Sequence, residues 1–292
     1  MIKNILVPLT GCSNDASALE AAYFIGARFS ANVLCLRVHP NPMQIVAQAA
    51  LGQFSTTMGN VQLIHAIEER CNARTTKART AFDQFSERIS SPASTLGEGA
   101  IAASWQQIEG DPLEETIAAA RYSDMIVLGR APEDGDFNTD SVANILVRSG
   151  RPVLLVPDKP VKAIGWHIAI AWKETAEAAR AVTAAMPLLL QAKRVAVLCA
   201  NENEAAPGSS EDLGPAARLA EQLAHHGLSP DAKDIAFSKQ PASQALIHAA
   251  QDFGADLLVA GGYSHSRFRE LVFGGFTRQV LQACNLPVLL LH

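Results

Sequence analysis

Short runs of uninterrupted apolar residues recur along the chain, separated by longer stretches of mixed polarity. An uninterrupted apolar run is typical of a strand buried on both faces, as in a parallel sheet covered by helices. The runs predict ten strands, at about residues 3–9, 32–38, 102–108, 124–129, 152–156, 167–172, 194–200, 232–237, 255–260 and 287–291.

The stretches between these runs predict helices, at about residues 15–29, 112–121, 175–190, 215–226 and 241–252. Pro112 and Pro241 stand at two of the predicted starts. Proline suits the first helical turn because its missing N–H has no helical partner there. Strands that alternate with helices in this way predict an open, doubly wound α/β sheet.

Three sequence blocks occur twice and in the same order, which indicates an internal duplication. The paired blocks are residues 5–10 and 168–173, residues 124–129 and 256–261, and residues 151–156 and 286–291. The duplication predicts two domains, 1–158 and 164–292, joined by a proline-stiffened linker over residues 157–162. Each domain is expected to contain a mostly parallel five-stranded sheet with helices on both faces.

The first copy contains a long insertion, because the offset between the copies falls from 163 to 132 residues and so leaves 31 extra residues in the first. The insertion falls within about residues 41–90 and is predicted to be helical. Asn41-Pro42 opens a helical segment to about Gln53, and one apolar stripe runs from Val61 to Ile89. This second helix either packs on its own domain, covers a pocket or forms a partner surface.

Composition and charge exclude several protein classes. The 292 residues are 48% hydrophobic and 18% charged, which excludes disorder and a coiled coil. A net charge of −5 argues against a general nucleic-acid binder, and no apolar stretch reaches the ~18 residues of a membrane span. The start has no signal-peptide pattern, and the five cysteines form no C-x-x-C pair. We therefore expect a reduced cytoplasmic protein.

The chemistry is expected at the loop after the fourth strand of the second copy, because ligands bind beyond the carboxyl ends of strands where the strand order reverses. Gly261, Gly262 and Ser264 can present backbone N–H groups as an anion-binding concavity. Gly274-Gly275 then opens a helix whose N-terminus offers further N–H groups, and Arg267 and Arg269 add positive charge nearby. The loop is either a phosphate cradle or a glycine-rich connection that binds nothing.

At this point the sequence resembles the universal stress protein (UspA) family in its tandem form, over nearly the whole chain apart from the insertion. The Ile-Leu-Val-Pro opening, the fourth strand ending in Gly and the closing Pro-Val-Leu strand carry the resemblance. In the family's ATP-binding branch, an Asp after the first strand contacts adenine, and a Gly-x2-Gly-x9-Gly-[Ser/Thr] loop holds the phosphates and ribose. In the second copy the spacing is intact, but Ser264 replaces the second Gly, Gly275 the final Ser/Thr and Lys173 the Asp.

The resemblance implies ATP or a related adenine nucleotide as the ligand, with or without Mg²⁺. A lysine cannot accept a hydrogen bond from an adenine amino group, but Lys173 could meet a phosphate as a point charge. The implied binding residues are Ala171, Lys173, Gly261, Gly262, Ser264, His265, Ser266, Arg267, Gly274, Gly275, Phe276 and Thr277.

The first copy departs further from the family pattern. Thr10 replaces the Asp, and Glu133, Asp134 and Asp136 follow its fourth strand, where acidic groups would repel a phosphate. We expect no ATP in this half. Its loop would serve structure or a partner, and a different ligand under the long helices stays open.

Other candidate residues point less clearly to a function. His225-His226 is expected to meet a helix end and solvent rather than a metal. His265 would contact a phosphate, carry a proton or stay solvated. Trp172 would floor a pocket or belong to the core.

Three functions follow from these observations. The first is a stress-associated regulatory protein that binds a nucleotide through its second domain. The second is an interaction or small-ligand protein acting through its surface or its N-terminal pocket. The third, a hydrolase or transferase, has no base poised beside a nucleophile and no carboxylate cluster for Mg²⁺ in the cradle loop, so at most weak ATP hydrolysis is expected. The two copies are expected to pair internally around a pseudo-two-fold axis; a homodimer stays open.

Overall fold

The computed structural model describes residues 1–41, 57–90, 101–130, 137–159, 161–201, 213–237, 241–262, 279–280 and 284–292. The strands are β1 (Asn4–Pro8), β2 (Asn32–His39), β3 (Ala102–Glu109), β4 (Met125–Gly129), β5 (Val153–Val156), β6 (His167–Trp172), β7 (Arg194–Asn201), β8 (Asp231–Ala236), β9 (Leu257–Gly261) and β10 (Val288–Leu291). The sequence therefore predicted all ten strands, with ends that differ by at most two residues.

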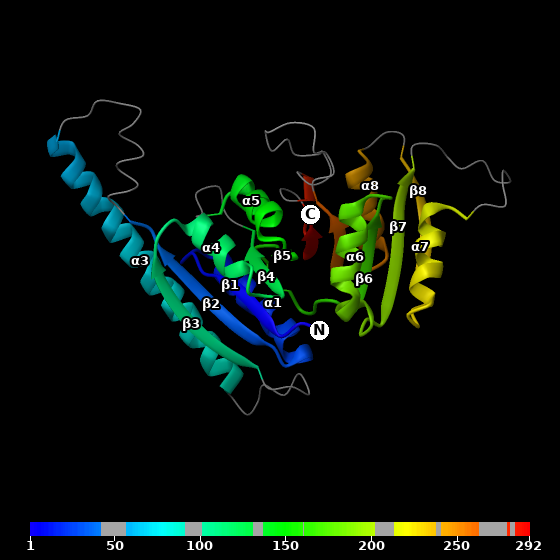
Figure 1. Cartoon of the computed structure of the whole chain (residues 1–292), viewed down its shortest axis with the longest axis horizontal. Coiled ribbons are helices and arrows are strands. Elements are labelled where there is room, and N and C mark those ends of the chain that lie inside the picture. The colour runs from blue at the N-terminus through cyan, green and yellow to red at the C-terminus, as the bar shows by residue number, and fades with distance from the viewer. Residues whose placement is uncertain are drawn as a thin grey trace.

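The ten strands form one continuous sheet in the order β3-β2-β1-β4-β5-β10-β9-β6-β7-β8 (Figure 1). Every neighbouring pair within β1–β5 and within β6–β10 is parallel. The two sets meet at β5 and β10, which pair antiparallel with Leu154 opposite Leu289. The predicted fold class is confirmed, and the two five-stranded sheets are joined edge to edge.

Helices cover both faces of this sheet. The described helices are α1 (Asn14–Phe29), α3 (Thr57–Ser90), α4 (Pro112–Ala120), α5 (Thr139–Ser149), α6 (Ala176–Leu189), α7 (Pro215–Ala224) and α8 (Ala242–Asp252). Residues of α1, α3, α6 and α7 share one buried apolar cluster, and residues of α4, α5 and α8 share the other. Successive strand residues point to opposite faces, so Val7 belongs to the first cluster and Leu6 to the second.

Two details of the helix predictions need comment. Pro241 was predicted to be the first residue of its helix, but it is the N-cap of α8, which begins one residue later at Ala242. The predicted helical segment from Asn41 to Gln53 lies outside the described residues after position 41. Among the helices that the structure describes, none is long and apolar enough to cross a membrane.

The long insertion helix α3 packs on its own half of the chain. Its buried residues Ala78, Phe82 and Phe85 belong to the cluster shared with α1, and Phe82 meets Trp105 of β3 with ring centroids 5.6 Å apart. Figure 1 shows the first turns of α3 extending past the edge of the sheet. The amphipathic stripe therefore faces the core along the second part of the helix.

The repeated Asp of the duplication has a structural role at the amino ends of the strands. Asp124 accepts hydrogen bonds from the backbone N–H groups of Lys3 (2.7 Å) and Asn4 (2.9 Å). Asp256 accepts in the same way from Gly165 (2.8 Å) and His167 (3.1 Å). Both carboxylates thus fix the start of the first strand of their half, at the opposite end of the sheet from the expected ligand.

Two arginines of the first half bind backbone carbonyls of the second half or of the segment that leads into β6. Arg28 of α1 donates to the oxygens of Ile164 (2.9 Å) and Gly165 (3.1 Å). Arg130, directly after β4, donates to the oxygens of Val280 (2.9 Å) and Cys284. Hydrogen bonds from charged groups are stronger than neutral ones, so these contacts reinforce the pairing of β5 with β10.

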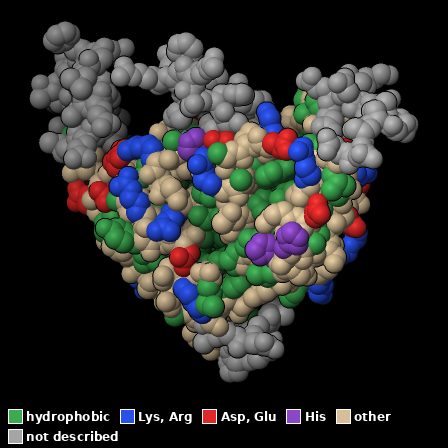
Figure 2. Space-filling view, turned by 45° about the vertical axis from the view of Figure 1, so that its right-hand side comes forward, with side chains coloured by type: hydrophobic (Ala, Val, Ile, Leu, Met, Phe, Trp, Pro, Cys, Tyr) green, Lys and Arg blue, Asp and Glu red, His purple; other side chains and the backbone are tan. Residues whose placement is uncertain are grey.

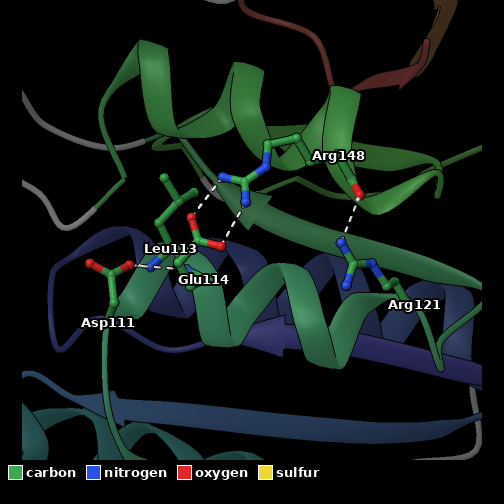
Figure 3. Close-up of polar contacts among 5 residues, drawn as sticks. All are labelled: Asp111, Leu113, Glu114, Arg121 and Arg148. Carbon is green, nitrogen blue, oxygen red and sulfur yellow. Dashed lines mark hydrogen bonds and ion pairs between the residues drawn. The ribbon is translucent and has the colours of Figure 1, made fainter.

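Helix α4 is capped at its N-terminus, and an ion pair joins it to α5 (Figure 3). The Asp111 side chain accepts from the N–H groups of Leu113 and Glu114, both at 2.9 Å, at the N-terminus of α4. Arg148 of α5 donates twice to the Glu114 carboxylate, at 2.7 and 2.6 Å. The cap satisfies N–H groups that have no partner within the helix.

Glycines end the fourth strand of each half because a helix backbone lies directly against them. A Cβ on Gly129 would lie 2.4 Å from the Asn14 oxygen at the start of α1. A Cβ on Gly261 would lie 2.5 Å from the Ala178 nitrogen in the first turn of α6. The duplication therefore preserves a close approach of the first helix to the end of the fourth strand.

Asp111→Ala should remove the cap of α4 and lower the free energy of unfolding by about 1 kcal/mol. Urea denaturation followed by circular dichroism measures this change. Asp158→Ala is the matched control, because Asp158 is an exposed carboxylate outside any helix. Equal effects of the two substitutions would contradict the capping role.

Gly261→Ala should lower the free energy of unfolding by about 1–3 kcal/mol, since the added methyl group overlaps backbone atoms of α6. The control is Gly26→Ala within α1, where the nearest atoms are the flexible end of Ile101 at 3.4 Å. Alanine is the better helix former, so the control should keep or raise stability. A Gly261→Ala variant as stable as the control would show that α6 does not lie so close.

Candidate functional site

The structure brings four of the expected binding residues to the carboxyl edge of β6 and β9. Ala171 is buried near the end of β6, where it pairs with Ala260 of β9. Lys173 is exposed just beyond that strand, and its carbonyl accepts from the N–H of Thr175 at 2.7 Å. The Thr175 hydroxyl caps α6 by accepting from Ala178. An ammonium group and a helix N-terminus therefore lie at the same edge.

The other two, Gly261 and Gly262, lead the chain away from β9. The Gly262 N–H donates to the oxygen of Leu291 at 2.9 Å, and its own oxygen lies 3.2 Å from Nδ1 of His292. A Cβ on Gly262 would lie 2.7 Å from a methyl group of Leu146 in α5. The second glycine therefore lies against the first half of the chain.

The remaining expected residues lie outside the described part of the chain. They are Ser264, His265, Ser266, Arg267, Gly274, Gly275, Phe276 and Thr277. Arg269 and the acidic residues Glu133, Asp134 and Asp136 of the first half lie outside it as well. The phosphate cradle therefore stays a prediction from sequence.

In the first half, a buried polar network occupies the corresponding position at the end of β1. Asp15 accepts from the N–H groups of Thr10 (2.9 Å) and Gly11 (2.7 Å), and from the Thr10 hydroxyl (3.0 Å). Burial raises the pKa of Asp15, against the opposing effects of these hydrogen bonds and of the Arg37 charge. The carboxylate holds the β1–α1 loop closed.

Arg37 of β2 lies in this network and is only 1% exposed. Its guanidinium donates to the carbonyl oxygens of Leu9 and Thr10, both at 3.2 Å, and to the Thr75 hydroxyl of α3 at 3.2 Å. Its side chain therefore fills the space beyond the end of β1. That no nucleotide binds in this half stays a prediction from sequence.

Strand register identifies the residue that takes the place of Arg37 in the second half. Leu36 pairs with Pro8 in the first half, and Leu198 pairs with Ala171 in the second. The next residue is Arg37 in β2 and Cys199 in β7, so a short buried thiol corresponds to the long guanidinium. Sequence reasoning missed this contrast. Its only signal was one arginine within an apolar strand, and the pairing of the copies was needed to interpret it.

An open apolar pocket of about 460 Å³ lies between α6 and α7 in the second half. Trp172, Met186 and Leu219 line it, and Arg218 pairs with Glu174 at 3.0 Å along its wall. Trp172 also packs against the core cluster, so the two expectations for this residue both hold. On the face drawn in Figure 2, hydrophobic side chains gather across the centre with groups of Lys and Arg beside them.

The five cysteines form no disulfide, and four of them are buried. Burial raises the pKa of the Cys35 thiol to about 12 and raises the pKa of Cys199 and Cys284 as well. Cys12 is half-buried in the β1–α1 loop.

His226 lies beside Gln222 on the wall of the α6–α7 pocket. The described residues hold no group of three or more side chains suited to a metal ion.

Comparison with known proteins gives a family match for the second half of the chain and a fold match for the whole chain. Residues 167–292 match the model of the universal stress protein family. A universal stress protein of Synechocystis is 44% identical over 48 residues, which are 16% of this chain and 17% of that protein. The matched region therefore covers less than a fifth of the length of this curated relative.

Two solved structures resemble the whole chain in fold. A universal stress protein from Archaeoglobus fulgidus has a TM-score of 0.61 and 14% identity, and the match covers 99% of this chain and 97% of that one. A putative universal stress protein from Pseudomonas aeruginosa has a TM-score of 0.57 and 16% identity, with 99% and 93% covered. The second half of the chain, residues 167–292, therefore matches the universal stress protein family in sequence, and both halves together have the fold of these structures.

Proposed function

We propose that this protein binds an adenine nucleotide in its second half, beyond the carboxyl ends of β6 and β9, and none in its first half. The family match supports the choice of half, because it covers residues 167–292. In open α/β sheets the ligand site lies where the strand order reverses. Here that point is the gap between β6 and β9, since these two neighbours connect to opposite sides of the sheet.

The observation that carries the proposal is the contrast between Arg37 and Cys199. In the first half the guanidinium is buried on the carbonyls of Leu9 and Thr10 and excludes other groups from this place. In the second half the same register position holds a thiol with a single heavy atom beyond Cβ. The second half therefore has no side chain at this position that competes with a ligand.

Lys173 supplies the charge that a phosphate requires. Its side chain is exposed at the edge of the sheet, directly before the capped N-terminus of α6. A lysine ammonium binds phosphate as a point charge, and exposed charge contacts weaken as salt screens them.

Nucleotide binding is therefore expected to be weaker at high ionic strength. The Lys173→Ala variant should lose affinity most clearly at low salt.

Cys199→Arg tests the proposal by placing the first half's arginine in the second half. The purified wild-type protein should release an adenine nucleotide when denatured, or its melting temperature should rise with millimolar ATP. The arginine variant should show neither, because the guanidinium would occupy the space beyond Trp172. Mass spectrometry of the released ligand and thermal shift measure both effects.

Cys199→Ala is the matched control and should retain the nucleotide, since it only removes a sulfur atom. Circular dichroism of the arginine variant establishes that it is folded. Binding by a folded Cys199→Arg variant would refute the location of the site. No released nucleotide together with no thermal shift in the wild-type protein would refute nucleotide binding itself.

A further inference from the structure

The open apolar pocket between α6 and α7 is a separate candidate for a ligand site. Its volume of about 460 Å³ is within the range of small-molecule sites. The lining starts at the end of β6 and follows α6 as far as Met186 and α7 as far as His226, so the pocket runs along the helices toward the amino edge of the sheet. We propose that it binds an uncharged small molecule with an aromatic or hydrocarbon body and a hydroxyl group.

The duplication identifies the first-half residues that correspond to the lining. The offset of 163 residues between the copies also holds at the start of the first helix of each half. A Cβ on Gly129 would lie 3.0 Å from the carbonyl carbon of Asn14, and a Cβ on Gly261 would lie 2.8 Å from that of Glu177. Trp172, Thr183 and Met186 of the pocket therefore correspond to Leu9, Glu20 and Tyr23.

These positions are covered in the first half and less covered in the second. Leu9 and Tyr23 are each only 2% exposed, whereas Trp172 and Met186 are half-buried. In the first half the cover comes from α3, whose Arg88 lies over the Tyr23 ring, 4.3 Å from its centroid. Helix α7 has 10 residues against the 34 of α3. A ligand in the pocket would bury apolar surface that the first half buries with its own side chains.

The charges of the lining favour an uncharged ligand. One carboxylate and one guanidinium line the pocket, and these groups of Glu174 and Arg218 pair with each other at 3.0 Å. Gln222 and His226 also contact each other, with 3.2 Å between their nitrogens. A charged ligand would have to break the ion pair or lie against apolar side chains without a partner, which is costly.

Thr183 provides acceptors for a hydroxyl group at the wall of the pocket. Its own hydroxyl donates to the Ala179 oxygen at 3.1 Å, which leaves its lone pairs as acceptors. Its carbonyl lies four residues before Pro187 within α6, and a proline has no N–H to donate to it. The corresponding residue of the first half is Phe24, which has an N–H. An O–H group on the ligand would supply a donor beside this helix.

A small molecule fits the pocket better than a helix of a second copy. A helix with its side chains is about 10 Å across, so two turns of it occupy on the order of 800 Å³. The pocket has about 460 Å³. Its two walls are already helices, and both belong to the apolar cluster on this face of the sheet. The space between them therefore suits a flat or narrow molecule.

N-phenyl-1-naphthylamine is an uncharged dye whose fluorescence rises in apolar surroundings, and it serves as the probe. It should bind the wild-type protein, and 2-naphthol should displace it. Naphthalene has the same rings without the hydroxyl, so it should need at least about threefold higher concentration because one net hydrogen bond is lost. The anion 2-naphthoate should displace the dye least.

The double variant Thr183→Glu/Met186→Tyr puts the first half's side chains into the pocket. It should bind the dye at least about tenfold more weakly, because the larger groups fill the space. Met186→Leu is the matched control and should retain the dye, since leucine is an apolar side chain of similar volume. Circular dichroism establishes that both variants are folded.

Two further measurements separate this pocket from the nucleotide site. None of the four described residues of that site lines the pocket. Lys173→Ala should therefore keep the affinity for the dye, and millimolar ATP should not displace it. The dye measurements do not require that a nucleotide binds, so either proposal can fail while the other stands.

Several outcomes would overturn the proposal. They are the absence of dye binding, equal binding by the double variant, displacement of the dye by ATP, and displacement by naphthalene or 2-naphthoate as readily as by 2-naphthol. Size-exclusion chromatography provides one more: a dimer that excludes the dye would assign the apolar surface to a second copy of the chain.

Discussion

Antiparallel pairing of β5 with β10 is the interaction on which the architecture of the whole chain depends. Each half would otherwise present an open strand edge with unsatisfied N–H and C=O groups. The pair satisfies both edges at once and makes the two apolar clusters continuous across the sheet, one on each face. Arg28 and Arg130 reinforce it with hydrogen bonds to carbonyls across the junction. The outer edges are then β3 and β8, and β8 carries exposed charged residues that discourage further pairing.

Most of the fold could be predicted from the sequence because its signals are local and occur twice. The eight inner strands are short apolar runs and were visible as such, whereas the two outer strands, β3 and β8, are more polar and exposed. The antiparallel junction was not visible, because the sequence does not state which edges of two similar units meet. The place of Pro241 at the N-cap was missed for another reason: helix ends depend on one or two backbone angles that propensity does not determine.

The candidate site was predictable only in part. Gly261 and Lys173 were identified, and the structure places both at the carboxyl edge of the sheet. The role of Gly129 and Gly261 in admitting a helix backbone could not be read from a glycine-rich loop, where a ligand offers an equal explanation. Arg37 was missed because its meaning lies in contacts with Leu9 and Thr10, which are distant in sequence. The loop after β9 remains known from sequence alone.

The buried Arg37 makes the specialisation of the two copies hard to reverse. Replacing it alone would leave the Asp15 carboxylate buried without its nearby positive charge, and would leave the carbonyls of Leu9 and Thr10 without their donor. Removing one partner of a buried charged pair is strongly destabilising. A return to an open first half would therefore need coordinated changes on β2, α1 and α3. Any single substitution away from this network therefore leaves a buried polar group without its partner.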